Sequence, residues 1–194
     1  MARELAAALG ASLVSSTVSR LLVDLNRSIG HPAHFSAATR GAPAAIREDI
    51  IARHYRPYRE RVERLVKRAV SRGRRVIHIS SHSFVPKLHG EVRNADVGLL
   101  YHTGPLRRRE AELSRRWKAS LADRAPQLRV RRNYPYAGRG DGLTSYLRRR
   151  FPPGAYAGIE LEVNQRVVLS GGGRWRELRR LLIDSLRAAC AGPP

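Results

Sequence analysis

Short apolar runs that alternate with helix-like segments are the feature that most restricts the fold of this sequence. The runs 76–80 ("VIHIS"), 95–101 ("ADVGLLY") and 155–163 ("AYAGIELEV") have the length and β-branched content of strands. The segments Arg107–Asp123 and Arg174–Ala189 repeat their apolar residues every three or four positions, as amphipathic helices do. Strands that alternate with helices build sheets covered on both faces, so we predict a three-layer α/β/α fold with a mixed, largely parallel sheet.

The early part of the chain carries weaker patterns. The run 11–17 ("ASLVSST") predicts a strand, and 20–26 ("RLLVDLN") predicts a strand or a buried segment. Residues 45–72 have helical periodicity. Pro57 lies inside that pattern, and an interior proline costs a helix about 3 kcal/mol, so we expect a kink or a break near Arg56.

Composition narrows the function classes. The 194 residues fit one domain spanning 1–194, and no stretch is apolar enough to cross a membrane. The net charge of +21 favours anionic partners, but all except three of the 37 cations are arginines spread along the whole chain. A nucleic-acid partner is therefore not expected. The single cysteine, Cys190, forms no intrachain disulfide and fits a reducing, cytoplasmic compartment, whereas the sequence does not determine the oligomeric state.

Two histidines, His78 and His82, lie within and just after the run 76–80. In α/β sheets, ligands bind where strands end, so polar residues at that point are candidates for a site. We expect the strand to end at Ser80, with His78 inside it and His82 beyond it. His82 is then the better ligand or catalytic candidate, and His78 is a supporting, hydrogen-bonded residue.

Arginines surround the apolar run 20–26. Arg20, Asn26 and Arg27 together suit the recognition of a carboxylate, because the guanidinium fork matches its two oxygens. The structural alternative, given equal weight, is a solvated surface pair together with a buried bridge between Asp24 and an arginine.

Two later segments allow both functional and structural readings. Glu160 and Glu162 share one face of a strand, so one of them could act as general base or metal ligand, or both could pair with the surplus arginines. The segment 129–142 ("RVRRNYPYAGRGDG") could bind nucleic-acid bases and phosphates, line a substrate site or form a simple turn.

Four co-linear segments together resemble the N-formylglutamate amidohydrolase family. They are residues 19–36 ("SRLLVDLNRSIGHPAHFS"), 76–101 ("VIHISSHSFVPKLHGEVRNADVGLLY"), 130–151 ("VRRNYPYAGRGDGLTSYLRRRF") and 156–166 ("YAGIELEVNQR"). This family is similar in fold to zinc carboxypeptidases and aspartoacylase-like deacylases. The resemblance implies a zinc-carboxypeptidase-like α/β fold and hydrolysis of a linear amide.

The resemblance also implies a mechanism and a substrate. A zinc ion would activate water for attack on the amide carbonyl of a small anionic N-acyl amino acid, such as N-formylglutamate. It assigns His82 as zinc ligand, Glu162 as general base, and Arg20, Asn26, Arg27, Asn133 and Tyr136 as substrate-binding residues.

One departure from the family pattern concerns the metal. The family's other zinc ligands lie in an N-terminal segment, ahead of the helix with which this chain begins. We therefore expect an N-terminally incomplete domain whose zinc site lacks ligands, since catalytic zinc normally has three protein ligands. Two competing hypotheses remain: a catalytically inactive relative of the family, and a basic nucleic-acid-binding protein that uses Arg129, Arg131 and Arg132.

Overall fold

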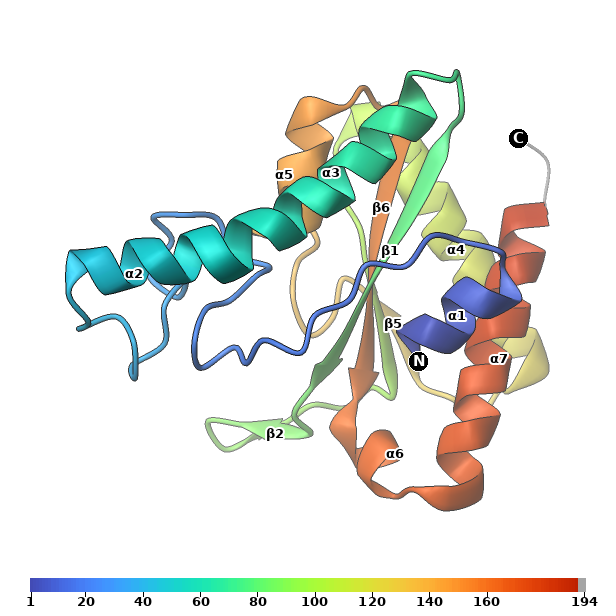
Figure 1. The fold of residues 1–194 in the computed structure, drawn as a ribbon. Helices are drawn as coiled ribbons and strands as arrows, with labels where there is room; N and C mark the ends of the chain where they lie inside the picture. Colours follow the sequence, from blue (N-terminus) through green and yellow to red (C-terminus); the bar gives the residue numbers. More distant parts are fainter. Residues whose placement is uncertain (192–194) are drawn as a thin grey trace. The chain divides into compact units, whose positions relative to one another are not determined.

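A four-stranded mixed sheet is the main β element of the computed structural model, which describes residues 1–191. Its strand order is β1 (Val76–Phe84), β6 (Tyr156–Asn164), β4 (Val97–Leu100) and β5 (Val130–Arg132). β4 pairs antiparallel with β6 and parallel with β5, and β1 runs in the same direction as β6 (Figure 1). The predicted α/β class with a mixed sheet is confirmed.

The chain divides into two units with separate apolar cores. The prediction of a single domain over residues 1–194 stays a prediction. Unit 1 consists of Met1–Ala11, Ile77–Gly140 and the chain from Ala157 onward, and unit 2 consists of Ser12–Val76 and Asp141–Tyr156.

Three helices complete the core of unit 1. α4 (Arg108–Arg124) packs along α7 (Gly172–Ala191), and α1 (Ala2–Ala8) lies against α7 (Figure 1). Trp117 is fully buried between them, and its indole N–H donates to Ser185 Oγ at 3.0 Å. Each large apolar side chain buried here stabilises the unit by about 1.5–3 kcal/mol. Both helices follow the periodicity that the sequence predicted.

β1 is longer than the sequence predicted. It continues past Ser80 to Phe84, which is 2% exposed, so His82 lies within the strand and the expected strand end was wrong. The serines and the histidine extend the strand because the buried Phe84 anchors its far end. Four short elements complete unit 1: β2 (Lys87–Leu88), β3 (Glu91–Val92), η2 (Pro105–Arg107) and α6 (Gln165–Leu169).

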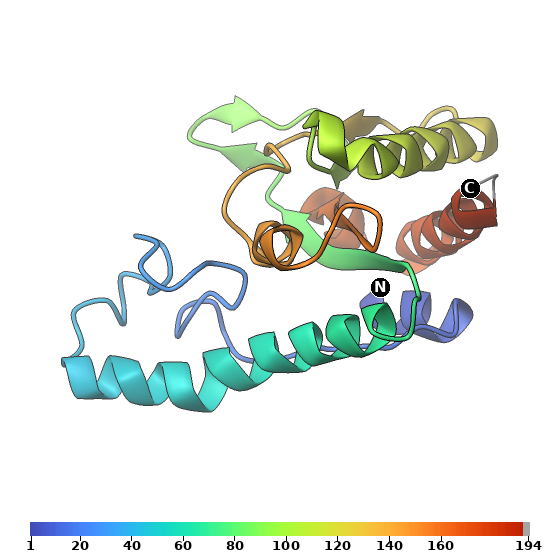
Figure 2. The ribbon, with the colours of Figure 1, turned by 90° about the horizontal axis from the view of Figure 1, so that it is seen from above.

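A long helical rod dominates unit 2. α2 (Ala44–Ile50), the π-helical turn η1 (Ile51–Tyr55) and α3 (Arg56–Val70) follow one another without a loop (Figure 2). The interruption predicted near Arg56 takes the form of this π turn, after which α3 begins at Arg56. The backbone hydrogen bonds of a π turn join residues five apart instead of four. Pro57 has no backbone N–H to donate, and the π turn lets the chain include it without ending the helix.

The rod packs on other segments of unit 2. Val62 and Val66 of α3 meet Leu147 of α5 (Leu143–Arg150) in one apolar cluster. Val23, which is fully buried, joins the other end of the rod. The strand predicted for 11–17 does not form, and 20–26 is the buried segment rather than the strand, with Val23 and Asp24 buried. Turns replace the strand at 20–26, since Asp24 accepts a hydrogen bond from the backbone N–H two residues on and so competes with strand pairing.

We predict that Gly98→Ala destabilises the protein by about 1–3 kcal/mol or more, because overpacking a close backbone contact forces a shift. A Cβ at Gly98 would lie 2.0 Å from the carbonyl oxygen of Tyr134 and 3.2 Å from Cβ of Glu162, its partner across β4 and β6. Urea unfolding measures the loss.

Gly154→Ala is the matched control, since a Cβ there meets nothing within 4 Å. It should leave the free energy of unfolding unchanged or raise it slightly. Equal midpoints for the two variants would contradict the tight contact at Gly98.

Candidate functional site

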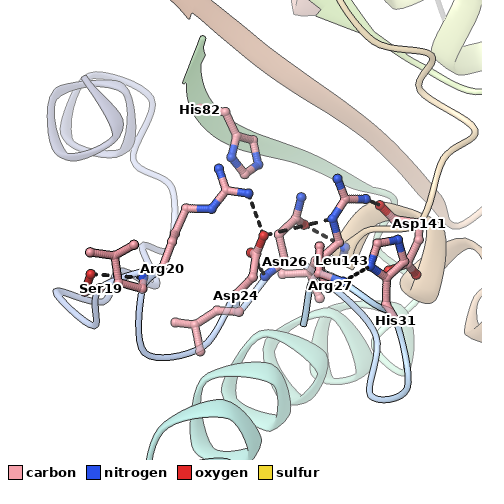
Figure 3. Close-up of polar contacts among 12 residues, drawn as sticks. Ser19, Arg20, Asp24, Asn26, Arg27, His31, His82, Asp141 and Leu143 are labelled. Atoms are coloured by element: carbon pink, nitrogen blue, oxygen red, sulfur yellow. Dashed lines mark hydrogen bonds and ion pairs between the residues drawn. The ribbon is translucent and has the colours of Figure 1, made fainter. Parts of the chain in front are cut away.

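A buried carboxylate organises the arginine-rich loop of unit 2. Asp24 is 5% exposed, and its Oδ2 lies 2.5 Å from Arg20 NH2 and 4.0 Å from Arg27 Nε (Figure 3). The Asp24–arginine bridge considered from the sequence is therefore present. It does not consume the guanidinium groups, because the Arg20 side chain is 73% exposed and further N–H donors remain on both arginines.

Asn26 links this loop to helix α5. Its Oδ1 accepts a hydrogen bond at 2.8 Å from Leu143 N, at the first turn of α5, and its own N–H donates to Asp24. An asparagine oxygen in that position satisfies a backbone donor that the helix itself cannot. With the oxygen occupied, the side-chain Nδ2 is the group of Asn26 that could donate to an anion.

Asp141 fixes the other side of the loop, and sequence reasoning did not single it out. Its carboxylate accepts from Ser28 N at 2.8 Å and from Ser28 Oγ at 2.5 Å, and its carbonyl accepts from Arg27 NH1 at 2.7 Å. Burial opposes ionisation of Asp141, but the Ser28 hydrogen bonds and nearby positive charge prevail and lower the pKa of this carboxyl. Its place between two glycines in "GRGDG" was the available sequence signal.

A buried aromatic cluster packs beneath the arginine-rich loop in the core of unit 2 and holds its backbone. His34 is 2% exposed, with its ring edge-on to Tyr55 at 4.7 Å and to Phe35 at 4.9 Å. The Tyr55 hydroxyl donates to the carbonyl of Arg27, and the His34 carbonyl accepts from Asp24 N. These bonds hold both ends of the arginine-bearing segment in place.

Glu162 is a buried acid on a central strand of unit 1. It is 5% exposed on β6, opposite Gly98 of β4, and Glu160 lies on the same face at 9% exposure. Asp96, also in unit 1, pairs with two arginines, with Arg166 NH2 at 2.7 Å and Arg129 Nε at 3.3 Å.

His82 is half-buried in β1 of the same unit. Its Nε2 lies 2.8 Å from Ser80 Oγ, as expected for residues two apart on one face of a strand. The far ends of β1 and β6 are joined through Gln165 Nε2, which donates to Ser83 Oγ at 3.3 Å. His82 and Glu162 therefore belong to strands that are neighbours in the sheet.

Asn133 and Tyr136 have different places in the loop after β5. Asn133 has a positive φ of 49°, and its Oδ1 accepts from Tyr101 N at 2.9 Å and Gly138 N at 3.2 Å. It therefore shapes the loop backbone. Tyr136 is 46% exposed, and its hydroxyl accepts from Arg93 NH1 at 2.8 Å.

The cations proposed for nucleic-acid contact in this loop are engaged within unit 1. Arg129 pairs with Asp96, and Arg131 stacks over the ring of Tyr134 at 4.9 Å. Arg132 donates to the hydroxyl of Tyr101 at 2.5 Å. The structure therefore gives this cluster an internal role.

The fit of a zinc ion can be judged from the residues present. Among residues 1–191 no three His, Cys, Asp or Glu side chains come together as a metal-binding group. Catalytic zinc normally has three protein ligands, so the described residues do not by themselves fit a zinc site. Zinc binding through His82 stays a prediction. None of the helices within 1–191 has the length and apolar character to span a membrane.

These features define an α/β domain with a mixed sheet, with a buried strand carboxylate in one unit and an arginine-rich loop in the other. A comparison with protein-family models matches residues 1–169 to N-formylglutamate amidohydrolase. The chain therefore belongs to the N-formylglutamate amidohydrolase family, as its sequence resemblance indicated.

A solved structure supports the fold. The crystal structure of gene product Atu2144 from Agrobacterium tumefaciens aligns with a TM-score of 0.81 and 26% sequence identity. The alignment covers 98% of this chain and 75% of the other. A comparison with curated protein sequences gave no significant match.

The stability of the protein should fall as the pH drops below about 6.5, the ordinary pKa of histidine. Burial lowers the pKa of His34 in the folded state. Between the two pKa values the unfolded chain binds a proton that the folded chain does not, so acid favours unfolding. Urea unfolding from pH 7.5 to 5 measures this loss.

His34→Phe retains an aromatic ring and removes the titration, so it should flatten the pH dependence. His89→Asn, at an exposed turn position, is the control and should keep it. An unchanged slope in His34→Phe would contradict the assignment to His34.

Proposed function

We propose that the protein hydrolyses the N-formyl or N-acyl amide of an acidic amino acid, with N-formylglutamate as the reference substrate. The family match supports amidohydrolase activity, and the buried carboxylate of Glu162 on a central strand is the observation that carries the proposal. A carboxylate held away from bulk water is suited to accept a proton from an attacking water molecule.

The arginine-rich loop is proposed to bind the substrate's carboxylates. Arg20 and Arg27 each carry a planar set of donors, of which Asp24 and the Asp141 carbonyl use only part. The guanidinium groups are held in place by these contacts before a ligand arrives, which lowers the entropic cost of binding. Neutral N-acyl amides lack the charge that this loop would recognise.

No step of the proposed hydrolysis is assigned to a metal, because the described residues do not form a zinc site. That observation favours a second candidate function, a family member that binds N-acyl amino acids without hydrolysing them. Calorimetric titration with N-formylglutamate and an assay for released formate, each with and without added zinc, separate the two. Binding without formate release supports the second candidate, and no binding in any condition contradicts both.

Glu162→Gln should lower kcat for N-formylglutamate by about 10²–10⁴, with KM little changed, because the amide cannot accept the proton. Glu160→Gln, its neighbour on the same strand face, is the control and should retain most activity. Formate release at saturating substrate measures both. Full activity in Glu162→Gln would show that another group is the base.

Arg20→Lys should raise KM about tenfold or more with kcat nearly unchanged, because a charged hydrogen bond contributes about 1.5–3 kcal/mol. Lysine preserves a positive charge beside Asp24, so folding is retained, but it loses the fork that grips a carboxylate. Arg61→Lys, an exposed position on α3, is the matched control. Equal KM values for the two variants would remove Arg20 from substrate binding.

A further inference from the structure

A basic surface on unit 2 has no role in the proposed chemistry. Its cations lie at the C-terminal end of α3 and in the turn that follows, and every one of them is exposed. No Asp or Glu occurs in residues 64–90. We call this surface the basic face; it consists of Arg64, Lys67, Arg68, Arg72, Arg74 and Arg75.

Other arginine-rich helices of the chain are built differently. Exposed cations of α4 are interleaved with acids, and Arg115 pairs with Glu112 at 2.7 Å. In α7, Arg187 pairs with Asp184 at 3.4 Å. Helix α5 also contains no acid, but its Arg148 is buried and its Arg150 pairs with Glu63 at 2.5 Å. Among α3, α4 and α7, only the end of α3 combines a high arginine content with an absence of acids. A general arginine bias therefore does not account for the basic face.

Fold stability explains only part of this arrangement. Lys67 and Arg68 in the last turn of α3 interact favourably with the helix dipole. Arg72 lies beyond the helix, and the like-charged pairs Arg64–Arg68 and Arg68–Arg72, four residues apart, are unfavourable where they share a helical surface. Within the described residues, an ion pair of the basic face joins Arg64 to Glu60 at 4.0 Å.

The residues on and around the basic face favour a nucleic-acid partner over a membrane. Val62 and Val66, on the opposite side of α3, are buried in the core of unit 2, so the helix has no free apolar side to insert into a membrane. No large exposed apolar side chain lies between Ile46 and Ile77. Arginine forks match phosphate oxygens, and duplex nucleic acid presents one charge per ~1.7 Å along its axis.

We infer that the basic face binds the phosphate backbone of double-stranded nucleic acid. The contact reads no base sequence, because it consists of cations on the outside of a helix and a turn. With about four phosphates engaged, affinity falls about 10²-fold between 50 and 200 mM salt. This binding is independent of amide hydrolysis, which uses other residues.

Fluorescence anisotropy of the full chain with a labelled 24-base-pair DNA duplex, over 50–200 mM NaCl, tests the inference. The triple variant K67E/R68E/R72E should weaken binding at least 30-fold at 100 mM salt and reduce the salt slope by about 2–3. The milder K67Q/R68Q/R72Q should weaken it in the same direction, and circular dichroism checks that both variants fold.

R174E/R176E/R180E on α7 is the matched control, because it changes the net charge equally at exposed arginines. It should weaken binding no more than threefold. Equal losses in the two charge-reversal variants, or no wild-type binding at 100 mM salt, would overturn the inference. Equally tight binding to phosphatidylserine vesicles would also overturn it, since the surface would then not select nucleic acid.

Discussion

The burial of the Asp24 carboxylate is the constraint on which the arginine-rich loop depends. A buried charge costs several kcal/mol unless it is paired and hydrogen-bonded. Arg20, Arg27 and the backbone N–H of Asn26 meet that requirement together. The same contacts orient two guanidinium groups, so the interactions that make the loop stable also prepare it for an anion.

Periodic segments of the sequence predicted the fold well, and segments without a period did not. α4, α7 and β6 follow from their apolar spacing, because packing on one face dictates where apolar residues must recur. The π-helical form of the interruption before Pro57 and the continuation of β1 through its serines were missed. Both depend on what the segment packs against, which local pattern does not contain.

In the candidate site, too, the sequence predicted some features and missed those that depend on the folded chain. The residue types at Glu162 and Arg20 pointed to chemistry, and the structure shows one of them buried and the other exposed. Asp141 was missed because its partner Ser28 lies 113 residues away in the sequence. Asn133 stays a predicted substrate-binding residue, and its oxygen also accepts hydrogen bonds from two backbone N–H groups, a contact that becomes visible only once the loop is folded.

The hydrogen bond from Leu143 N to Asn26 makes the arginine-rich loop and helix α5 thermodynamically dependent on each other. Loss of a side-chain cap costs a helix about 0.5–2 kcal/mol. A ligand that pulls the Asn26 side chain toward itself must supply that free energy, whereas a ligand that leaves it in place gains from a helix already formed. The first turn of α5 would therefore report occupancy of the loop through its amide hydrogen exchange, with no contact to the ligand at all.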